Sequence, residues 1–244
     1  LLMASLYTAG QHGSQALLIL QRGLDAHPDN LELLDAQAIT LIRHGQHSEA
    51  ETILQRIISL EPKILDHRLR LVAALDQQKQ YEKAESILRE AIQIDPDSEE
   101  RRLAMAEYVA KRRGVNDVEA SLQQARKDLP HSAKIQFALG SLYEMTKRSE
   151  QARTTYESVR SDFKGKPESL EAQVKLASLD WTAGKHEATE QQIQDILKEN
   201  PRSADALLLR GKIALHRANG KDATQDFRSV LKDQPESAEV HLLL

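Results

Sequence analysis

The chain contains no cysteine among its 244 residues. This absence excludes disulfides, thiolate nucleophiles and cysteine-ligated zinc within the sequence. Aromatic residues make up only 4%, with a single tryptophan. No apolar run approaches the ~20 residues of a bilayer-spanning helix, so we expect no membrane insertion by this segment. The formal net charge of −4 gives no electrostatic argument for binding nucleic acid.

Catalytic and cofactor motifs are missing as well. The sequence has no nucleophile elbow, P-loop or dinucleotide fingerprint, so we predict neither enzymatic activity nor a cofactor. His12, His44, His47 and His186 fall in expected turns without an acidic partner at motif-like spacing. A metal site needs three or four converging ligands, so we predict no metal. The short basic run at 111–113 complements a helix C-terminus and is too short to indicate nucleic acid.

What the sequence does have is a period. Its seven prolines are separated by 34, 34, 34, 37, 34 and 34 residues, at Pro28, Pro62, Pro96, Pro130, Pro167, Pro201 and Pro235. Thirty-four residues is the length of a helix–turn–helix repeat. The spacing therefore predicts a chain built from one repeated pair of helices.

Other positions keep phase with the prolines. Two residues after each proline stands a capping residue in six of seven cases, which predicts the start of a helix: Asn30, Ser98, Ser132, Ser169, Ser203 and Ser237, with Ile64 the exception. Glycines at Gly10, Gly45, Gly114, Gly184 and Gly220 predict left-handed backbone where that helix ends.

Small and large side chains alternate in the same register. Ten residues after the prolines come Ala38, Val72, Ala106, Gly140, Ala177 and Gly211. In the second helix, a mostly small position is followed four residues later by a large one, in the pairs Ala16/Leu20, Ala50/Leu54, Ala84/Leu88, Val118/Leu122, Ala152/Tyr156, Thr189/Ile193 and Ala223/Phe227. Such alternation interlocks antiparallel helices into one core.

The period, the small residues and the closing proline resemble tetratricopeptide repeats over nearly the whole chain. The resemblance implies an all-α fold, a right-handed superhelical solenoid of antiparallel helix pairs with about seven repeats. We expect a single solenoid over 1–244, with repeats at roughly 1–30, 31–64, 65–98, 99–132, 133–169, 170–203 and 204–237 and the start of another at 238–244. Because both ends fall inside apolar helical patterns, we expect a fragment of a longer chain.

The resemblance also implies that the first helix of each pair lines a concave groove for a peptide or a partner protein. The positions seven, eleven and fourteen residues after each proline are expected to face it. Our candidate contacts are Leu69, Leu103, Glu107, Lys111, Phe137, Glu144, Met145, Val174, Trp181 and Leu208. The alternative is that the large apolar members pack against the neighbouring repeat.

The function predicted from this resemblance is a non-catalytic scaffold that binds a protein or peptide. A clamp for a chaperone's C-terminal carboxylate is not expected, because Leu69, Ala73, Leu103 and Glu107 replace the lysine and asparagine it needs. Two alternatives are a periplasmic scaffold for bacterial exopolysaccharide export, which places the chain in the envelope, and the docking arm of a larger enzyme. Self-association through Leu1–Leu2 and Leu242–Leu244 is a further alternative.

Overall fold

A computed structural model describes residues 13–244, and every regular element among them is an α-helix. The chain divides into two compact units, Leu1–Ser121 and Leu122–Leu244. The first unit contains α2 (Gly13–Ala26), α3 (Leu31–Arg43), α4 (His47–Leu60), α5 (Leu65–Gln77), α6 (Tyr81–Ile94) and α7 (Glu99–Arg112). Helix α8 (Val115–Asp128) crosses the boundary. The second unit contains α9 (Ala133–Met145), α10 (Ser149–Asp162), α11 (Pro167–Thr182), α12 (His186–Glu199), α13 (Ala204–His216), α14 (Gly220–Asp233) and α15 (Ala238–Leu243).

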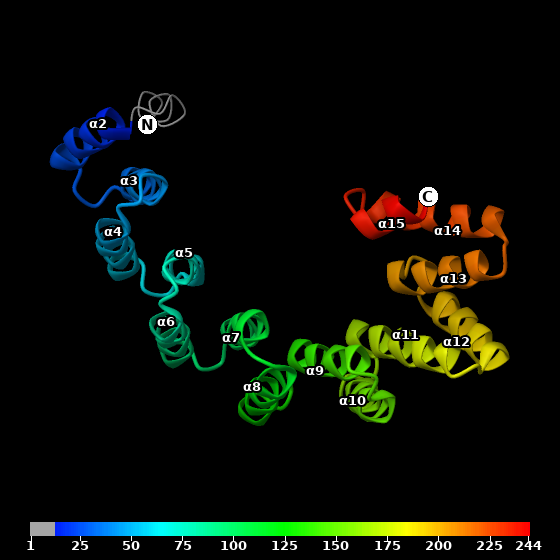
Figure 1. Ribbon diagram of the computed structural model, residues 1–244. Coiled ribbons are helices and arrows are strands. Elements are labelled where there is room, and N and C mark those ends of the chain that lie inside the picture. Colours follow the sequence, from blue (N-terminus) through cyan, green and yellow to red (C-terminus); the bar gives the residue numbers. More distant parts are fainter. Residues whose placement is uncertain (1–12) are drawn as a thin grey trace. The chain divides into compact units, whose positions relative to one another are not determined.

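The helices follow one another as packed pairs (Figure 1). In the first unit, α3 packs against α4 and α5 against α6. In the second, α9 packs against α10, α11 against α12 and α13 against α14. The predicted fold class, all-α with consecutive helix pairs, is therefore confirmed. The exact repeat limits stay predictions.

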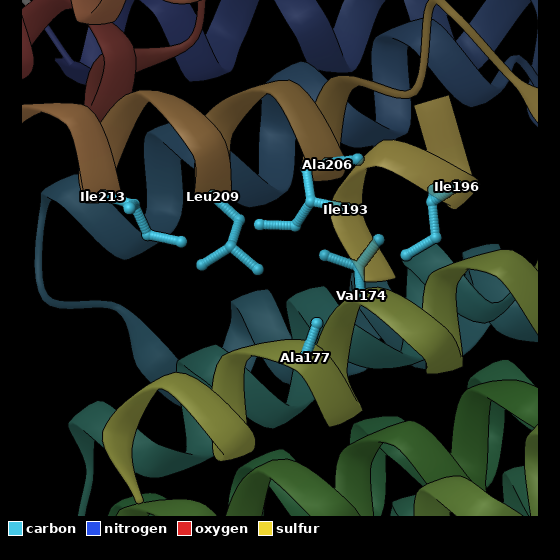
Figure 2. Packing of buried hydrophobic residues seen from close by; sticks show 7 residues of the cluster. All are labelled: Val174, Ala177, Ile193, Ile196, Ala206, Leu209 and Ile213. Carbon is cyan, nitrogen blue, oxygen red and sulfur yellow. The ribbon is translucent and has the colours of Figure 1, made fainter. Parts of the chain in front are cut away.

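The alternating small and large positions form part of the core. All of them are buried in the described chain, from Ala16 and Leu20 to Ala223 and Phe227. Figure 2 shows how three consecutive helices share one such cluster: Val174 and Ala177 from α11, Ile193 and Ile196 from α12, and Ala206, Leu209 and Ile213 from α13. Each helix pair therefore buries its apolar side against the next pair as well as within itself.

Capping residues start most of the first helices, as predicted. The side chains of Asn30, Ser98, Ser132 and Ser203 each accept a hydrogen bond from the backbone N–H three residues on. The prediction for Ser169 is wrong. Helix α11 begins at Pro167 with Lys166 as its N-cap, because proline suits the first helical position. Ser169 is buried, and its hydroxyl donates to the carbonyl of Arg160 at 2.9 Å.

A left-handed residue recurs seventeen positions after the proline in five repeats: Gly45, Lys79, Lys147, Gly184 and Ala218. The prediction holds for Gly45 and Gly184 and is wrong for Gly114 and Gly220, which do not have positive φ. Gly220 is the first residue of α14, and Ala218 takes the left-handed place before it. Gly10 lies outside the described residues. The position in the repeat thus decides where the backbone is left-handed, whether or not the residue there is glycine.

Candidate functional site

All ten candidate contacts lie on the first helix of a pair. Leu69 is on α5; Leu103, Glu107 and Lys111 are on α7; Phe137, Glu144 and Met145 are on α9; Val174 and Trp181 are on α11; Leu208 is on α13. Where a helix carries more than one of them, they follow the first at four, seven or eight residues, which places them along one side of that helix. We call the side of α9, α11 and α13 that carries Phe137, Trp181 and Leu208 the first-helix face of the second unit.

In the first unit, Leu69 and Leu103 are half-buried, whereas Glu107 and Lys111 are exposed. The basic run that contains Lys111 is largely tied to neighbouring helices. The Arg112 guanidinium forms an ion pair with Asp76 of α5 and lies 4.6 Å from the ring centre of Tyr81. Arg113 pairs with Glu85 of α6. The two arginines thus tie the end of α7 to α5 and α6.

In the second unit, the candidates differ in how much surface they offer. Met145 is 83% exposed at the end of α9. Phe137 and Leu208 are half-buried, and each packs against a core cluster while keeping one side open. Val174 is only 6% exposed and belongs to the core shown in Figure 2. Its side chain contributes to packing, so Val174 is not part of the exposed surface of α11.

Trp181 lies in a cluster of rings at the end of α11. Its ring centre is 4.1 Å from that of His186 and 5.8 Å from that of His216, which meets it edge-on. The Arg217 guanidinium lies 5.5 Å from the same ring. These neighbours come from α12 and from the end of α13, so Trp181 links two repeats. The sequence does hold a signal for this contact, since Trp181 and His216 stand at nearly the same register in consecutive repeats.

Glu144 is also held from within the chain. It accepts a hydrogen bond from the hydroxyl of Tyr156, a fully buried residue of α10. Burial, followed by the hydrogen bond to Glu144, raises the pKa of Tyr156. The Tyr156 ring lies 6.1 Å from that of Phe137. Phe137 and Glu144 are therefore braced by one residue of the paired second helix.

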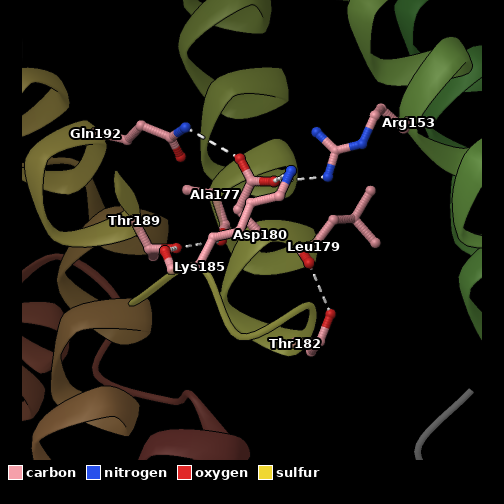
Figure 3. A network of polar contacts seen from close by, with 8 residues as sticks. All are labelled: Arg153, Ala177, Leu179, Asp180, Thr182, Lys185, Thr189 and Gln192. Carbon is pink, nitrogen blue, oxygen red and sulfur yellow. Dashed lines mark hydrogen bonds and ion pairs between the residues drawn. The ribbon is translucent and has the colours of Figure 1, made fainter. Parts of the chain in front are cut away.

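A buried carboxylate next to Trp181 joins three helices (Figure 3). Asp180 of α11 accepts from Arg153 of α10 at 2.7 Å and from Gln192 of α12 at 3.0 Å. Lys185, in the turn before α12, donates at 3.2 Å. Burial alone would raise the pKa of Asp180, but the hydrogen bonds from Gln192, Arg153 and Lys185 outweigh it and lower that pKa. The network fixes the end of α11 that carries Trp181 to the turn that follows it.

Arg153 belongs to a wider pattern of charged contacts between repeats. The residue directly after the small position of the second helix pairs with the next repeat in four places: Glu51 with Lys83, Glu85 with Arg113, Arg153 with Asp180, and Glu190 with Arg217. In three of these pairs the second helix supplies the carboxylate, whereas in the fourth it supplies the arginine, Arg153. Each of these pairs joins one repeat to the next, so together they fix the register of one repeat against its neighbour.

Within residues 13–244, no group of three or more histidine, aspartate or glutamate side chains is arranged to hold a metal ion. Of the histidines predicted to be polar turn residues, His186 lies against Trp181 with its ring tilted by 57°, and His12 lies outside the described residues. No helix in the same range is long and apolar enough to cross a membrane.

Solved structures with similar folds include a tetratricopeptide repeat protein from Parabacteroides merdae, 17% identical, with a TM-score of 0.59 and coverage of 99% of this chain and 94% of that one. The APC/C hetero-tetramer Cut9–Hcn1 gives 13% identity and a TM-score of 0.51, and human IFIT1, solved as a dimer with PPP-AAAA, gives 19% and 0.51. The match to Cut9–Hcn1 covers 99% of this chain and 47% of that one. The match to IFIT1 covers 92% of this chain and 56% of that one. The chain thus spans about half the length of these two proteins. No curated protein sequence matches it.

Two sequence models of one repeat family match the chain itself. The first matches residues 41–108, and the second matches 103–167 and 174–238. The second model alone covers more than half of the sequence. Its two segments contain helix pairs with the small and large core positions and the recurring left-handed turn. Repeats of this kind form scaffolds that bind protein partners. The chain belongs to the tetratricopeptide repeat family.

Proposed function

We propose that this chain is a non-catalytic scaffold that binds a peptide or a protein on the first-helix face of the second unit. The observation that carries the proposal is apolar surface on successive first helices. Met145 is 83% exposed on α9, which also carries the half-buried Phe137, and Leu215 is 39% exposed on α13, which also carries the half-buried Leu208. The half-buried Trp181 lies on α11. Large apolar side chains in partly open positions are typical anchors of protein interfaces.

The first helices lie close enough to form one surface. Phe137 of α9 packs on the cluster that contains Ala172 of α11. Trp181 of α11 meets His216 of α13. Rigid helices that hold these side chains in place reduce the entropy lost when a partner binds.

The test replaces exposed apolar residues, because their loss does not disturb the core. Met145→Lys combined with Leu215→Lys should abolish or strongly weaken partners that are retained by the unaltered chain in affinity purification. The matched control is Leu60→Lys with Ile94→Lys, which changes residues of similar exposure to Leu215 at the ends of second helices. Equal retention by both variants, each with unchanged helicity, would exclude this face as the binding site.

Narrower roles rest on the sequence resemblance. A periplasmic scaffold for exopolysaccharide export requires a signal peptide or a lipobox at the start of the full gene, and a cytoplasmic start would reject it. A docking arm requires a catalytic domain in the same polypeptide. We also propose that nucleic acid is not a ligand, which a filter-binding assay with single-stranded RNA tests. Self-association is a further proposal, and sedimentation at increasing protein concentration tests it.

A further inference from the structure

A cavity of about 480 Å³ lies within the second unit, between the C-terminal half of α8, one side of α9 and the end of α10. Leu139 and Tyr143 of α9, both buried, form its apolar wall. Its volume falls in the range of ~300–1,000 Å³ that is typical of sites for small molecules. None of the ten candidate contacts lines it, so this cavity is separate from the first-helix face.

Gln136, which is 1% exposed, lines the cavity and has one polar atom without a partner. Its Nε2 donates to the carbonyl of Pro130 at 3.1 Å. Since that carbonyl can only accept, the amide cannot turn round, and Oε1 lies on the side away from this bond. No donor within residues 13–244 reaches Oε1, although buried polar atoms are normally hydrogen-bonded.

The bond to the proline recurs along the chain. The residue six positions after the proline makes it in four repeats: Arg68, Arg102, Gln136 and His241. An arginine supplies only donors, so in two of these repeats the contact leaves no acceptor without a partner. The proline bond therefore does not require a glutamine at position 136, whose Oε1 is left for a ligand to donate to.

Charged residues of both signs line the same cavity without meeting. Arg126 is half-buried and Lys127 is exposed on α8, and Asp162 is exposed at the end of α10. Among the described residues, none of these three has an ion-pair partner. The cavity of about 500 Å³ between α12, α13 and α14 is different, because there Arg210 donates to Asp226 at 2.8 and 2.6 Å. The charges of the first cavity thus remain open to a ligand.

Helix dipoles explain only part of this arrangement. Cations in the last turn of α8 complement the dipole of that helix. Asp162 does the opposite, since it is the last residue of α10 and places a negative charge at the negative end of that helix. Asp162 and the unpartnered Oε1 of Gln136 fit instead a cationic group in the cavity that both residues line.

We propose that this cavity binds a small zwitterion with an apolar body, either an amino acid or a dipeptide. The carboxylate of the ligand lies against Arg126 and Lys127, since guanidinium and ammonium groups form strong, charge-assisted hydrogen bonds with carboxylates. Its ammonium group donates to Oε1 of Gln136 and lies toward Asp162. Its apolar part covers the wall formed by α9. A ligand with only one sign of charge would leave one of these two sets of groups unpaired.

The test uses isothermal titration calorimetry on the whole chain, with L-leucine and the dipeptide leucyl-leucine as probes. We expect at least one of the two to bind, and their comparison identifies which kind of zwitterion fits. The amide of that probe lacks the carboxylate and its N-acetyl form lacks the ammonium group, so each should bind about tenfold more weakly. Failure of both probes to bind at millimolar concentration, or equal binding of the probe and its two modified forms, would overturn the inference.

Two variants separate the two ends of the site. Arg126→Gln with Lys127→Gln should weaken the zwitterion about tenfold and leave its amide unchanged. Gln136→Arg keeps a donor for the carbonyl of Pro130, as arginine does in two other repeats, but removes the acceptor and adds a positive charge. It should weaken the zwitterion and spare the N-acetyl form. Unchanged binding of the zwitterion in both variants, each with unchanged helicity, would show that the ligand lies elsewhere and would contradict the assignment.

The control for lost charge is Lys221→Gln with Arg228→Gln, which removes two exposed cations of α14 that do not line the cavity. We expect no change in binding, and an equal loss in this control would reduce the effect to net charge and overturn the inference. Met145→Lys with Leu215→Lys, the variant that tests the first-helix face, should also leave zwitterion binding unchanged, because neither residue lines the cavity. A loss in that variant would place the ligand on the first-helix face and exclude the cavity as its site.

Discussion

The ring of Phe227 fills the space that a side chain on Gly211 would occupy. A methyl group at Gly211 would lie 2.4 Å from Cε1 of Phe227. The same relationship holds between Gly140 and Tyr156, where the distance would be 2.3 Å. Where the large position holds an aliphatic residue, the facing small position is larger, as in the pairs Ala38/Leu54, Val72/Leu88 and Ala177/Ile193. Within each pair of helices, the two positions thus share one volume.

Replacing Gly211 by alanine should therefore destabilise the chain by ~1–3 kcal/mol, the usual cost of overpacking a core. In an open helix the same change would be stabilising by about 1 kcal/mol. Adding Phe227→Leu should recover part of the loss, because alanine and leucine fit together at this place in another repeat. Urea unfolding of the two single variants and the double variant, followed by circular dichroism, measures the coupling between the two positions.

Gly220→Ala is the control, because no atom lies within 4 Å of a methyl group there. We expect it to leave stability unchanged or to raise it slightly. If Gly211→Ala behaves like Gly220→Ala, the close approach between Gly211 and Phe227 is not a constraint on this core.

Much of this fold follows from the proline period and from the residues in phase with it. The buried small and large positions and the helix pairs are all legible in the sequence. The start of α11 could not be read from the sequence. Three extra residues shift the proline from the preceding turn to the first position of the helix itself. A residue count alone cannot tell which side of an insertion keeps its register.

The candidate site was less predictable. Periodicity places Val174 and Trp181 on one side of α11, but how deeply each is covered depends on the rotation of that helix against α12 and α13. Val174 faces their core, and Trp181 meets His186 and His216. The contacts that cover a side chain come from other repeats, and a single repeat's pattern does not contain them.

Lys147 adopts a left-handed conformation, with φ of 59°, in the turn between α9 and α10. A residue with a Cβ pays about 1–2 kcal/mol in this conformation, and glycine does not. Lys147→Gly should therefore be stabilising by ~0.5–1 kcal/mol, as glycine already occupies the equivalent places at Gly45 and Gly184. Thermal unfolding tests this directly.

The comparison for that variant is Lys111→Gly, at an exposed helical position near the end of α7. There glycine should be destabilising by about 1 kcal/mol, because helical backbone favours residues with a side chain. A loss of stability in both variants would show that the turn tolerates lysine without strain.

Asp180→Asn should cost ~1–3 kcal/mol at pH 7, because Arg153 and Lys185 lose a charged acceptor. The pKa of Asp180 in the folded chain is lowered from its usual value of about 3.9. A lowered folded pKa contributes stability above the unfolded value, and this contribution is lost as pH falls through the folded value. The difference between the unaltered chain and Asp180→Asn should therefore shrink below about pH 4 in urea unfolding.

The control for this pH dependence is Asp195→Asn, an exposed carboxylate that pairs with Lys198 on the same helix. Hydrogen bonds from Lys198 and Gln191 lower the pKa of Asp195 too, but water screens this exposed pair. The change should therefore have a smaller effect than Asp180→Asn at every pH. A constant difference between the unaltered chain and Asp180→Asn from neutral to acidic pH would contradict the assignment of the pH effect to the Asp180 carboxylate.

Trp181 is the only tryptophan in the chain, so its fluorescence reports the ring cluster at the end of α11 without interference. His186→Ala with His216→Ala removes two rings that cover the indole, at centre distances of 4.1 Å and 5.8 Å. Water should then reach more of the indole, and the emission maximum should move to longer wavelength while helicity is retained. Each lost ring contact should lower stability by ~0.5–1.5 kcal/mol.

His131→Ala, which alters an exposed histidine before α9, should leave the emission unchanged. An unshifted maximum in the double variant would mean that the histidines do not cover Trp181 in solution, and the indole would then offer a partner more surface than its half-buried position indicates.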